Sequence, residues 1–304
     1  ILEEHTDSYF SIHSMDEMKN VNDPSRTIFL AQAWEEDEID RILSKGVTNI
    51  VVDNKRDLDK LKTYLEKHDV TINLSLRMKL KEYSVRTEKH FVFGMDSDTV
   101  NTEIHRLKEN GAIERLGIHF HRKTQNISEW SYKKELEGAL DKQTFTIIDH
   151  INIGGGIPSE YVNTNKRVIP TILSKIEDLK EWMNEQGIDL VIEPGRYISA
   201  PTASLKTTIK AIYKNNIVID TSVYQGDMDA LIVPVKLRIS EEVGEDEGDP
   251  YVIKGKTPCS RDLFRYRTYL KNPQEGDELT FLNAGAYNFS TDFCSLQDIR
   301  HEIR

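Results

Sequence analysis

Short apolar runs alternate with amphipathic segments over the first two thirds of the chain. Seven runs rich in Ile and Val, each bounded by turn residues, predict buried parallel strands at residues 9–14, 27–33, 49–54, 71–78, 114–121, 146–153 and 190–194. Between them, apolar residues spaced three and four apart predict helices at residues 37–45, 56–68, 99–109, 129–140 and 172–185. This alternation indicates a parallel sheet, either open or closed into a barrel.

The number of strands favours a barrel that lacks one strand. A (β/α)8 barrel needs eight strands, and the pattern supplies seven. Residues 1–5 (ILEEH) resemble the end of a helix, and such a helix would follow a strand that the sequence does not contain. We therefore predict an α/β fold in which residues 1–203 form a TIM-type barrel whose first strand lies upstream of Ile1.

The pattern changes after about residue 204. Strand-like runs dominate at residues 205–213, 217–219, 231–239, 251–253 and 278–282, and acidic or glycine-containing loops separate them. The acidic run at 241–249 is typical of a solvated loop. We therefore predict that residues 204–304 form an all-β C-terminal domain.

Composition excludes several classes of function. The 304 residues have room for one barrel and a smaller domain, and 40 basic against 51 acidic residues give a net charge of −11. Negative charge argues against nucleic acid and anionic membranes as partners. No apolar run approaches the roughly 18 residues of a membrane span, and no secretory signal is visible. Two cysteines, Cys259 and Cys294, are too few for a disulfide scaffold, so we expect a cytoplasmic protein.

Two motifs at the ends of predicted strands suit an anionic ligand. Gly154, Gly155 and Gly156 directly follow a strand, where glycines let backbone N–H groups approach a phosphate closely. The alternative is a tight turn that needs positive φ. Glu193-Pro-Gly-Arg196 ends the last barrel strand, and an arginine binds phosphate through two parallel hydrogen bonds. The alternative here is that the two charges pair with each other or cap neighbouring elements.

Two further motifs are compatible with catalysis. Alternation along a strand places His119 and His121 on one face, where either packs in the core or stacks on a flat ligand. We predict no metal site, because no nearby Asp, Glu or Cys completes a zinc spacing. Cys259 lies two residues before Arg261, so its thiol is either inert packing or an acidified proton donor.

Taken in order, these motifs resemble one family. His-Phe-His, Gly-Gly-Gly-Ile-Pro, Glu-Pro-Gly-Arg, Cys259 and Gly285-Ala286-Tyr287 are similar to motifs of the fold type III (alanine racemase-like) amino-acid decarboxylases. That family includes ornithine, lysine, arginine, diaminopimelate and carboxynorspermidine decarboxylases. The resemblance implies pyridoxal 5'-phosphate as cofactor, an amino-acid substrate, a place in amino-acid metabolism or polyamine biosynthesis, and a homodimer with shared active sites.

The resemblance also implies roles for single residues. Glu193 would keep the pyridine nitrogen protonated, and His121 would stack on the ring. Cys259 of the partner subunit would protonate the carbon from which CO2 has left. The implied cofactor contacts are Arg77, His121, Thr124, Gly154, Gly155, Gly156, Glu193, Gly195, Arg196 and Tyr287.

Substrate choice depends on residues of the C-terminal part. Diaminopimelate enzymes hold a distal carboxylate with an Arg before a Pro, but Val233 precedes Pro234 here. The candidate substrate-binding residues are Asp227, Asp229 and Asp262. The first two suit the distal amine of a cationic diamino acid or polyamine precursor, and the alternative is that they are solvated loop charges.

The chain also departs from the family pattern. The Schiff-base lysine of the first barrel strand has no counterpart in the sequence, so we expect it upstream of Ile1. Ser11, Asn152 and Ser260 stand where the family usually has acidic residues. These departures leave two alternatives to a decarboxylase: a non-catalytic homologue that binds or regulates another molecule, and a pyridoxal-phosphate-dependent racemase.

Overall fold

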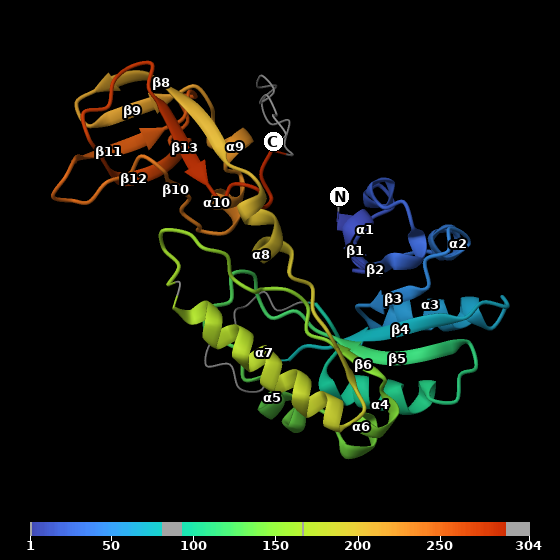
Figure 1. Cartoon of the computed structure of the whole chain (residues 1–304). Coiled ribbons are helices and arrows are strands. Elements are labelled where there is room, and N and C mark those ends of the chain that lie inside the picture. Colours follow the sequence, from blue (N-terminus) through green and yellow to red (C-terminus); the bar gives the residue numbers. More distant parts are fainter. Residues whose placement is uncertain (1, 81–92, 166, 290–304) are drawn as a thin grey trace. The chain divides into compact units, whose positions relative to one another are not determined.

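The computed structural model describes residues 2–80, 93–165 and 167–289 of the chain (Figure 1). The chain forms two compact units. The first unit consists of Ile1–Lys123, Ser128–Gly155 and Ile172–Glu193, and the second of Thr124–Ile127, Gly156–Thr171 and Pro194–Arg304. The boundary expected between residues 203 and 204 stays a prediction.

A parallel, barrel-like sheet forms the centre of the first unit. Its seven strands pair in the order in which they occur along the chain, and Figure 1 labels the first six of them. They are β1 Phe10–Ile12, β2 Thr27–Ala31, β3 Asn49–Val52, β4 Ile72–Arg77, β5 Ile113–His119, β6 His150–Asn152 and β7 Asp189–Val191. Every neighbouring pair is parallel. The predicted parallel α/β architecture is therefore confirmed.

Helices alternate with these strands. They are α1 Leu2–His5, α2 Glu36–Ser44, α3 Lys55–Leu65, α4 Ser97–Leu107, α5 Tyr132–Ala139, α6 Lys142–Ile147 and α7 Val168–Glu185, with short 3-10 turns at Glu17–Asn20 and Pro24–Arg26. Helix α3 begins where the Asn54 side chain accepts the N–H of Asp57. Leu58 and Leu61 on its predicted apolar face are fully buried. Gly187, with φ of +74°, follows α7 as expected of a C-terminal glycine.

One predicted strand of this unit is partly wrong. The apolar run at 146–153 was expected to be a single strand, but α6 extends to Ile147 and β6 begins only at His150. The Asp141 side chain accepts the N–H of Thr144 at 2.7 Å and so caps the start of α6. A capped helical turn therefore takes the first apolar residues of the run.

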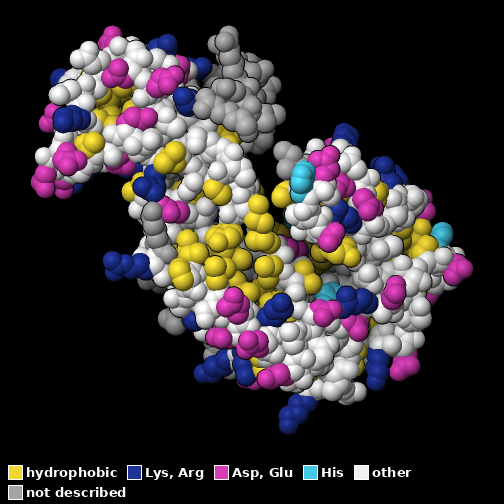
Figure 2. All heavy atoms as spheres, in the orientation of Figure 1, with side chains coloured by type: hydrophobic (Ala, Val, Ile, Leu, Met, Phe, Trp, Pro, Cys, Tyr) yellow, Lys and Arg dark blue, Asp and Glu magenta, His cyan; other side chains and the backbone are white. Residues whose placement is uncertain are grey.

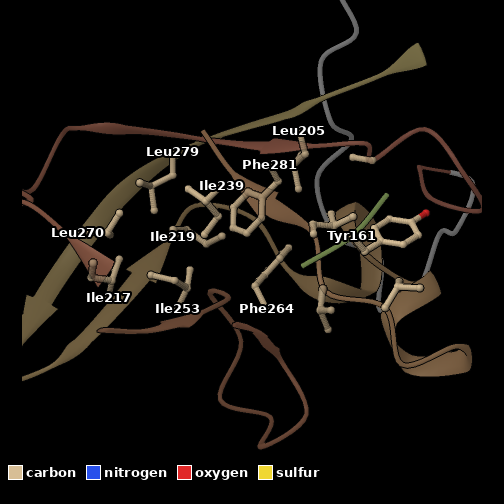
Figure 3. Close-up of a cluster of buried hydrophobic side chains, with 14 of the residues drawn as sticks. Tyr161, Leu205, Ile217, Ile219, Ile239, Ile253, Phe264, Leu270, Leu279 and Phe281 are labelled. Atoms are coloured by element: carbon tan, nitrogen blue, oxygen red, sulfur yellow. The ribbon is translucent and has the colours of Figure 1, made fainter. Parts of the chain in front are cut away.

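The second unit contains a mixed six-stranded sheet. Its strand order is β10-β13-β8-β9-β11-β12, with β8 Leu205–Tyr213, β9 Asn216–Ile219, β10 Arg238–Ile239, β11 Asp249–Lys254, β12 Leu263–Leu270 and β13 Glu278–Leu282. Only the β11–β9 pair is parallel among the pairs of this sheet. Figure 3 shows the core, where Leu205, Ile219 and Phe264 pack around Phe281.

The β domain expected for the C-terminal part is confirmed, with two short helices added between its strands. Helices α9 Val223–Gly226 and α10 Asp229–Ile232 lie within it, and α8 Gly195–Ser199 and a 3-10 turn at Ala200–Thr202 precede it. The predicted strand at 231–239 is the end of α10 followed by the two-residue strand β10, because Pro234 interrupts the apolar pattern. Strand β12 was not predicted, since charged residues alternate with its apolar ones.

Charged groups of both signs occur on the face of the protein that Figure 2 displays. Figure 2 shows acidic and basic side chains interspersed over the face that it displays. Within the described residues, none of the helices is long and apolar enough to cross a bilayer.

Candidate active site

The register of the parallel sheet places a row of polar residues at the carboxyl ends of its strands. Arg77 of β4 pairs with His119 of β5, which pairs with Asn152 of β6, which in turn pairs with Val191 of β7. Paired residues of neighbouring strands project to the same face of a sheet. Glu193 follows Val191 by two residues and so lies on the same side. The candidate site in the first unit is built on this row.

Glu193 is a fixed carboxylate. The Asn152 side-chain amide donates to its Oε1 at 2.9 Å, and His119 Nε2 lies 3.5 Å from its Oε2. The N–H of Glu193 donates to the Gly154 carbonyl at 2.9 Å. Burial by itself raises the pKa of Glu193, but the contacts with His119 and Asn152 outweigh it and lower the pKa to about 2. The group is therefore negative at neutral pH, and no ion pair joins it to an arginine or lysine among the described residues.

Glycines let the loop after β6 pack closely against Glu193. A Cβ atom on Gly154, whose φ is +66°, would lie 2.5 Å from the Phe120 carbonyl oxygen. A Cβ atom on Gly155 would lie 2.6 Å from the carbonyl oxygen of Glu193. No other residue type fits these two positions without displacing backbone. The tight-turn interpretation therefore explains Gly154.

The amides of the glycine loop differ in their availability to a ligand. The Gly154 N–H donates to Asn152 Oδ1 at 2.8 Å, and the Gly155 N–H donates to His121 Nδ1 at 3.2 Å. The Gly156 N–H donates to none of the residues that the structure describes. Of the three glycine amides predicted to bind a phosphate, only that of Gly156 thus has no hydrogen bond to the described residues.

His121 is a neutral ring beside this loop. Burial, helped by the charges of His119 and Arg77, lowers its pKa to about 4. Because Nδ1 accepts the Gly155 N–H, the single proton of the neutral imidazole is on Nε2. A neutral, oriented ring suits stacking on a flat ligand. Nowhere in the described ranges do three or more His, Cys, Asp or Glu side chains form a group that suits a metal ion.

Arg77 is held in place by a buried acid. Its Nη1 donates to Asp53 Oδ1 at 2.9 Å, and Asp53 also accepts from the Gly94 N–H at 3.2 Å and from Gln32 Nε2 at 2.8 Å. The guanidinium lies 4.9 Å from the centre of the Phe93 ring. These contacts fix a positive charge on the same row as His119 and Asn152.

Arg196 lies in the second unit and is paired with Asp229. Its Nη2 donates to Asp229 Oδ1 at 2.9 Å, and its Nη1 donates both to Asp229 Oδ2 and to the Tyr161 hydroxyl, the latter at 3.2 Å. The Tyr287 ring centre is 4.9 Å from the guanidinium. The Glu193 pairing considered from sequence is therefore not the one that forms. Among described residues, the buried Nε of Arg196 has no hydrogen-bond partner, so this donor is unused.

Gly285 brings Tyr287 against Arg196. A Cβ atom on Gly285 would lie 2.2 Å from the Ser199 carbonyl oxygen, and its N–H donates to Ala200 at 3.0 Å. The Tyr287 hydroxyl lies 3.4 Å from the position of a Cβ on Gly195. The Gly-Ala-Tyr motif and the Glu-Pro-Gly-Arg motif therefore meet through α8.

The three candidate substrate-binding aspartates are buried in the second unit. Asp227 is 1% exposed, and burial together with the charge of Asp229 raises its pKa well above the ordinary value. Asp229 uses both oxygens on Arg196. Asp262 accepts from an α9 backbone N–H at 2.7 Å and from the Thr257 N–H and hydroxyl at 3.0 and 2.6 Å. Their substrate contacts stay predictions, and the geometry gives Asp229 and Asp262 internal partners.

Cys259 is exposed and hydrogen-bonded to a tyrosine that sequence analysis missed. Its Sγ lies 2.8 Å from the Tyr224 hydroxyl. This bond is the main cause that lowers the pKa of Cys259, followed by the backbone N–H of Arg261. We expected the Arg261 side chain to lower the pKa of Cys259, but it is the backbone N–H of Arg261 that does so.

The predicted cofactor residues fall into two sets. The first unit brings together Arg77, His121, Gly154, Gly155 and Glu193. The second contains Thr124, Gly156, Gly195, Arg196 and Tyr287, and the Asn126 N–H two residues after Thr124 donates to the Gly156 carbonyl at 2.8 Å. Sequence reasoning missed the support that His119 and Asn152 give to Glu193. The strand register would have revealed this support, because His119 and Asn152 are paired neighbours on the row that leads to Glu193.

Comparison with known families identifies the family of the chain. The family model "Pyridoxal-dependent decarboxylase, pyridoxal binding domain" matches residues 4–200. The chain belongs to this decarboxylase family. The resemblance found in the sequence motifs is thereby confirmed, and the family's cofactor is pyridoxal 5'-phosphate.

Curated relatives are longer than the chain. A diaminopimelate decarboxylase of Methanothermobacter thermautotrophicus is 25% identical over 291 residues, which are 88% of this chain and 66% of the relative. A 2-[(L-alanin-3-ylcarbamoyl)methyl]-2-hydroxybutanedioate decarboxylase of Staphylococcus aureus is 24% identical over 290 residues, 86% of this chain and 72% of the relative. The chain thus spans about two thirds of the length of these relatives.

Solved decarboxylase structures have the same fold. A lysine decarboxylase of Selenomonas ruminantium superposes with a TM-score of 0.78 at 17% identity, covering 98% of this chain and 80% of that one. An arginine decarboxylase of Paramecium bursaria Chlorella virus gives 0.75 at 22% identity, covering 96% and 82%. The likeness confirms the fold type III architecture of a barrel-like α/β sheet and a β domain.

The residues of the first unit fit pyridoxal phosphate. A fixed carboxylate at Glu193 matches the positive charge of a protonated pyridine nitrogen, and the neutral His121 ring offers a flat surface. The glycines at 154 and 155 let the loop after β6 pack against Glu193 at the strand ends. The chemistry of this donor set is thus that of the family's cofactor site.

Proposed function

We propose that the protein of which this chain is part or whole decarboxylates a basic amino acid or a polyamine precursor with pyridoxal phosphate. The observation that supports this most is the Glu193 carboxylate, held by Asn152 and His119 with a pKa of about 2 at the carboxyl ends of parallel strands. Pyridoxal phosphate, when bound, would accept the electron pair of the C–C bond that breaks when CO2 leaves. The alternatives remain a binding protein and a racemase.

The chain's own residues supply orientation and charge. Glu193 holds a proton on the ring nitrogen, because its depressed pKa keeps it an anion that hydrogen-bonds a cation. His121 covers one face of the ring. The motifs of the second unit imply phosphate contacts at Thr124, Gly156, Gly195, Arg196 and Tyr287, and these contacts stay proposals.

The proposed substrate class rests on charge. Val233 offers no cation to a distal carboxylate, whereas Asp227 is a buried acid in the same segment. A distal amine close to Asp227 would favour the ionised form of this carboxyl group. We therefore rank a cationic diamino acid or polyamine precursor above diaminopimelate, which has a second carboxylate.

The remaining proposed contribution is a proton. Cys259 is exposed on this chain and has a lowered pKa, as a thiol that donates a proton needs. In the proposed homodimer it serves the active site of the other copy, so that each site contains residues of both chains.

The test uses the complete reading frame that encodes this chain, purified with pyridoxal phosphate. Release of labelled CO2 is measured for lysine, ornithine, arginine, diaminopimelate and carboxynorspermidine. Glu193→Gln keeps the shape but removes the charge, and we expect CO2 release to fall at least about 100-fold. The exposed Glu278→Gln is the matched control and should leave the rate unchanged.

The outcomes separate the alternatives. Exchange of the α-hydrogen without CO2 release would indicate a racemase, and failure to bind the cofactor would indicate a binding protein. Mixing Glu193→Gln with Cys259→Ala subunits tests the shared site. Half of the dimers are then mixed and have one intact site of two, so about a quarter of the wild-type activity should return. No recovery would reject the shared site.

A further inference from the structure

Two segments of the second unit meet at the Cys259 thiol. One is α9 with the residues just before it, and the other is the loop 255–262. The Tyr224 hydroxyl of α9 lies 2.8 Å from Cys259 Sγ. Ser222 caps α9 by accepting the Tyr224 N–H at 3.3 Å.

Asp262 holds the two segments together. Its Oδ1 accepts the Val223 N–H at 2.7 Å, and its Oδ2 accepts the Thr257 N–H at 3.0 Å and the Thr257 hydroxyl at 2.6 Å. The Lys256 N–H donates to the Thr221 carbonyl at 2.9 Å. Because Asp262 is 2% exposed, these bonds are shielded from water and fix the distance between the neighbours of Tyr224 and Cys259.

The groups around the thiol change the acidity of Cys259. Tyr224, then the backbone N–H groups of Arg261 and Asp262, lower the pKa of Cys259, while burial and the Asp262 charge raise it. The same contact raises the pKa of Tyr224 to about 12. Tyr224 therefore keeps its proton at neutral pH, so its hydroxyl is the donor whenever Cys259 is a thiolate.

We propose that Tyr224 is the positioning residue of Cys259, fixing the thiol and stabilising the thiolate that remains once Cys259 has given up its proton. This inference rests on the proposed function. In the proton transfer the S–H bond breaks and sulfur keeps its electron pair. The proton joins the electron pair left on carbon to form a C–H bond, and Tyr224 donates to the thiolate until solvent returns a proton.

The proposal is tested on the full-length protein with Tyr224→Phe. The rate of alkylation of Cys259 by iodoacetamide is measured from pH 6 to 10. Trypsin cleaves after Lys256 and Arg261, so mass spectrometry follows the modified thiol in the peptide 257–261. Only the thiolate reacts, so the midpoint of this profile reports the acidity of Cys259.

We expect the midpoint to rise by about one pH unit in Tyr224→Phe, with roughly tenfold slower alkylation at pH 7, because a donor to the thiolate is lost. Tyr266→Phe, at a tyrosine that is 69% exposed, is the matched control and should not change the profile. A fluorinated tyrosine at position 224 is a stronger donor and should lower the midpoint. Thermal melting confirms that each variant is folded.

Separate results bear on the two proposals. An unchanged alkylation profile in folded Tyr224→Phe would overturn the role of Tyr224. With an active enzyme, we expect Tyr224→Phe to lower kcat about tenfold and to leave KM unchanged, and an unchanged kcat would also overturn it. If Tyr224→Phe shifts the alkylation profile but the protein releases no CO2, the effect of Tyr224 on Cys259 stands. Only the proposed decarboxylase activity is then rejected.

Discussion

Asn152 joins the glycine loop to the carboxylate of Glu193. Its amide nitrogen donates to Glu193 Oε1 at 2.9 Å, and its oxygen accepts the Gly154 N–H at 2.8 Å. An aspartate at this position is able to make the second bond but not the first, because a carboxylate has no hydrogen to donate. The departure from the family's usual Asp thus adds a donor to Glu193.

The first prediction follows from that donor. Asn152→Asp replaces a hydrogen bond to Glu193 with a second negative charge, and like charges at this distance raise the pKa of a carboxylate. We expect affinity for pyridoxal phosphate to fall about tenfold, measured by equilibrium dialysis of the full-length protein. Asn216→Asp, at the first residue of β9 in the second unit, adds the same charge as a control. Equal losses in both variants would contradict the local explanation.

The second prediction concerns the buried pair of Arg196 and Asp229. Both are about 95% buried or more, and removing one partner leaves the other charge uncompensated. We expect Asp229→Asn to lower the free energy of unfolding by about 3 kcal/mol, measured by urea denaturation. The exposed Asp246→Asn should change it by less than about 0.5 kcal/mol. In the double variant Arg196→Met, Asp229→Leu, a loss as large as the sum of the single losses would refute this pairing.

The third prediction uses the sign of the Asp227 shift. Its folded pKa is raised above the unfolded value near 3.8, so the unfolded chain loses its proton first as pH rises. The stability from the neutral carboxyl is complete below that value and is lost as pH increases through the folded pKa. Asp227→Asn has no such loss, so its free energy of unfolding relative to wild type should increase from pH 4 to pH 8. A constant difference would mean that Asp227 is not buried neutral.

Much of the fold follows from local pattern. The strand runs of the first unit appear at the predicted places, because burial between helices selects continuous Ile and Val in parallel strands. Helix α6 was missed, since one capping residue, Asp141, decides a short segment that periodicity leaves ambiguous. Strand β12 was missed because its own residues carry no clear strand pattern. It forms through its antiparallel pairing with β11.

The candidate site was predictable in type but not in pairing. Motif order identified Glu193, His121 and the glycines, which strand ends place together. Sequence alone did not show that Asp229 pairs with Arg196, because the two are 33 residues apart and meet only through tertiary packing. Tyr224 is likewise 35 residues from Cys259. Contacts of this kind depend on the packing of whole segments and leave no periodic trace.

The last prediction tests the close approach of the glycine loop to Glu193. Gly155 is not in the left-handed region, so Gly155→Ala adds a steric effect and no backbone strain. Its Cβ would lie 2.6 Å from the Glu193 carbonyl oxygen, which therefore moves and takes the carboxylate out of line with Asn152. We expect a loss of about 1–3 kcal/mol in urea unfolding, with weaker retention of pyridoxal phosphate.

Gly111→Ala is the matched control for Gly155→Ala. A Cβ atom on Gly111 meets nothing within 4 Å, and its φ is likewise outside the left-handed region. The added methyl group there restricts only the unfolded chain, so stability should stay the same or rise by about 0.5 kcal/mol. If Gly155→Ala behaved like Gly111→Ala in both unfolding and cofactor retention, the loop would have room for a side chain. The position of Glu193 would then not depend on the glycines.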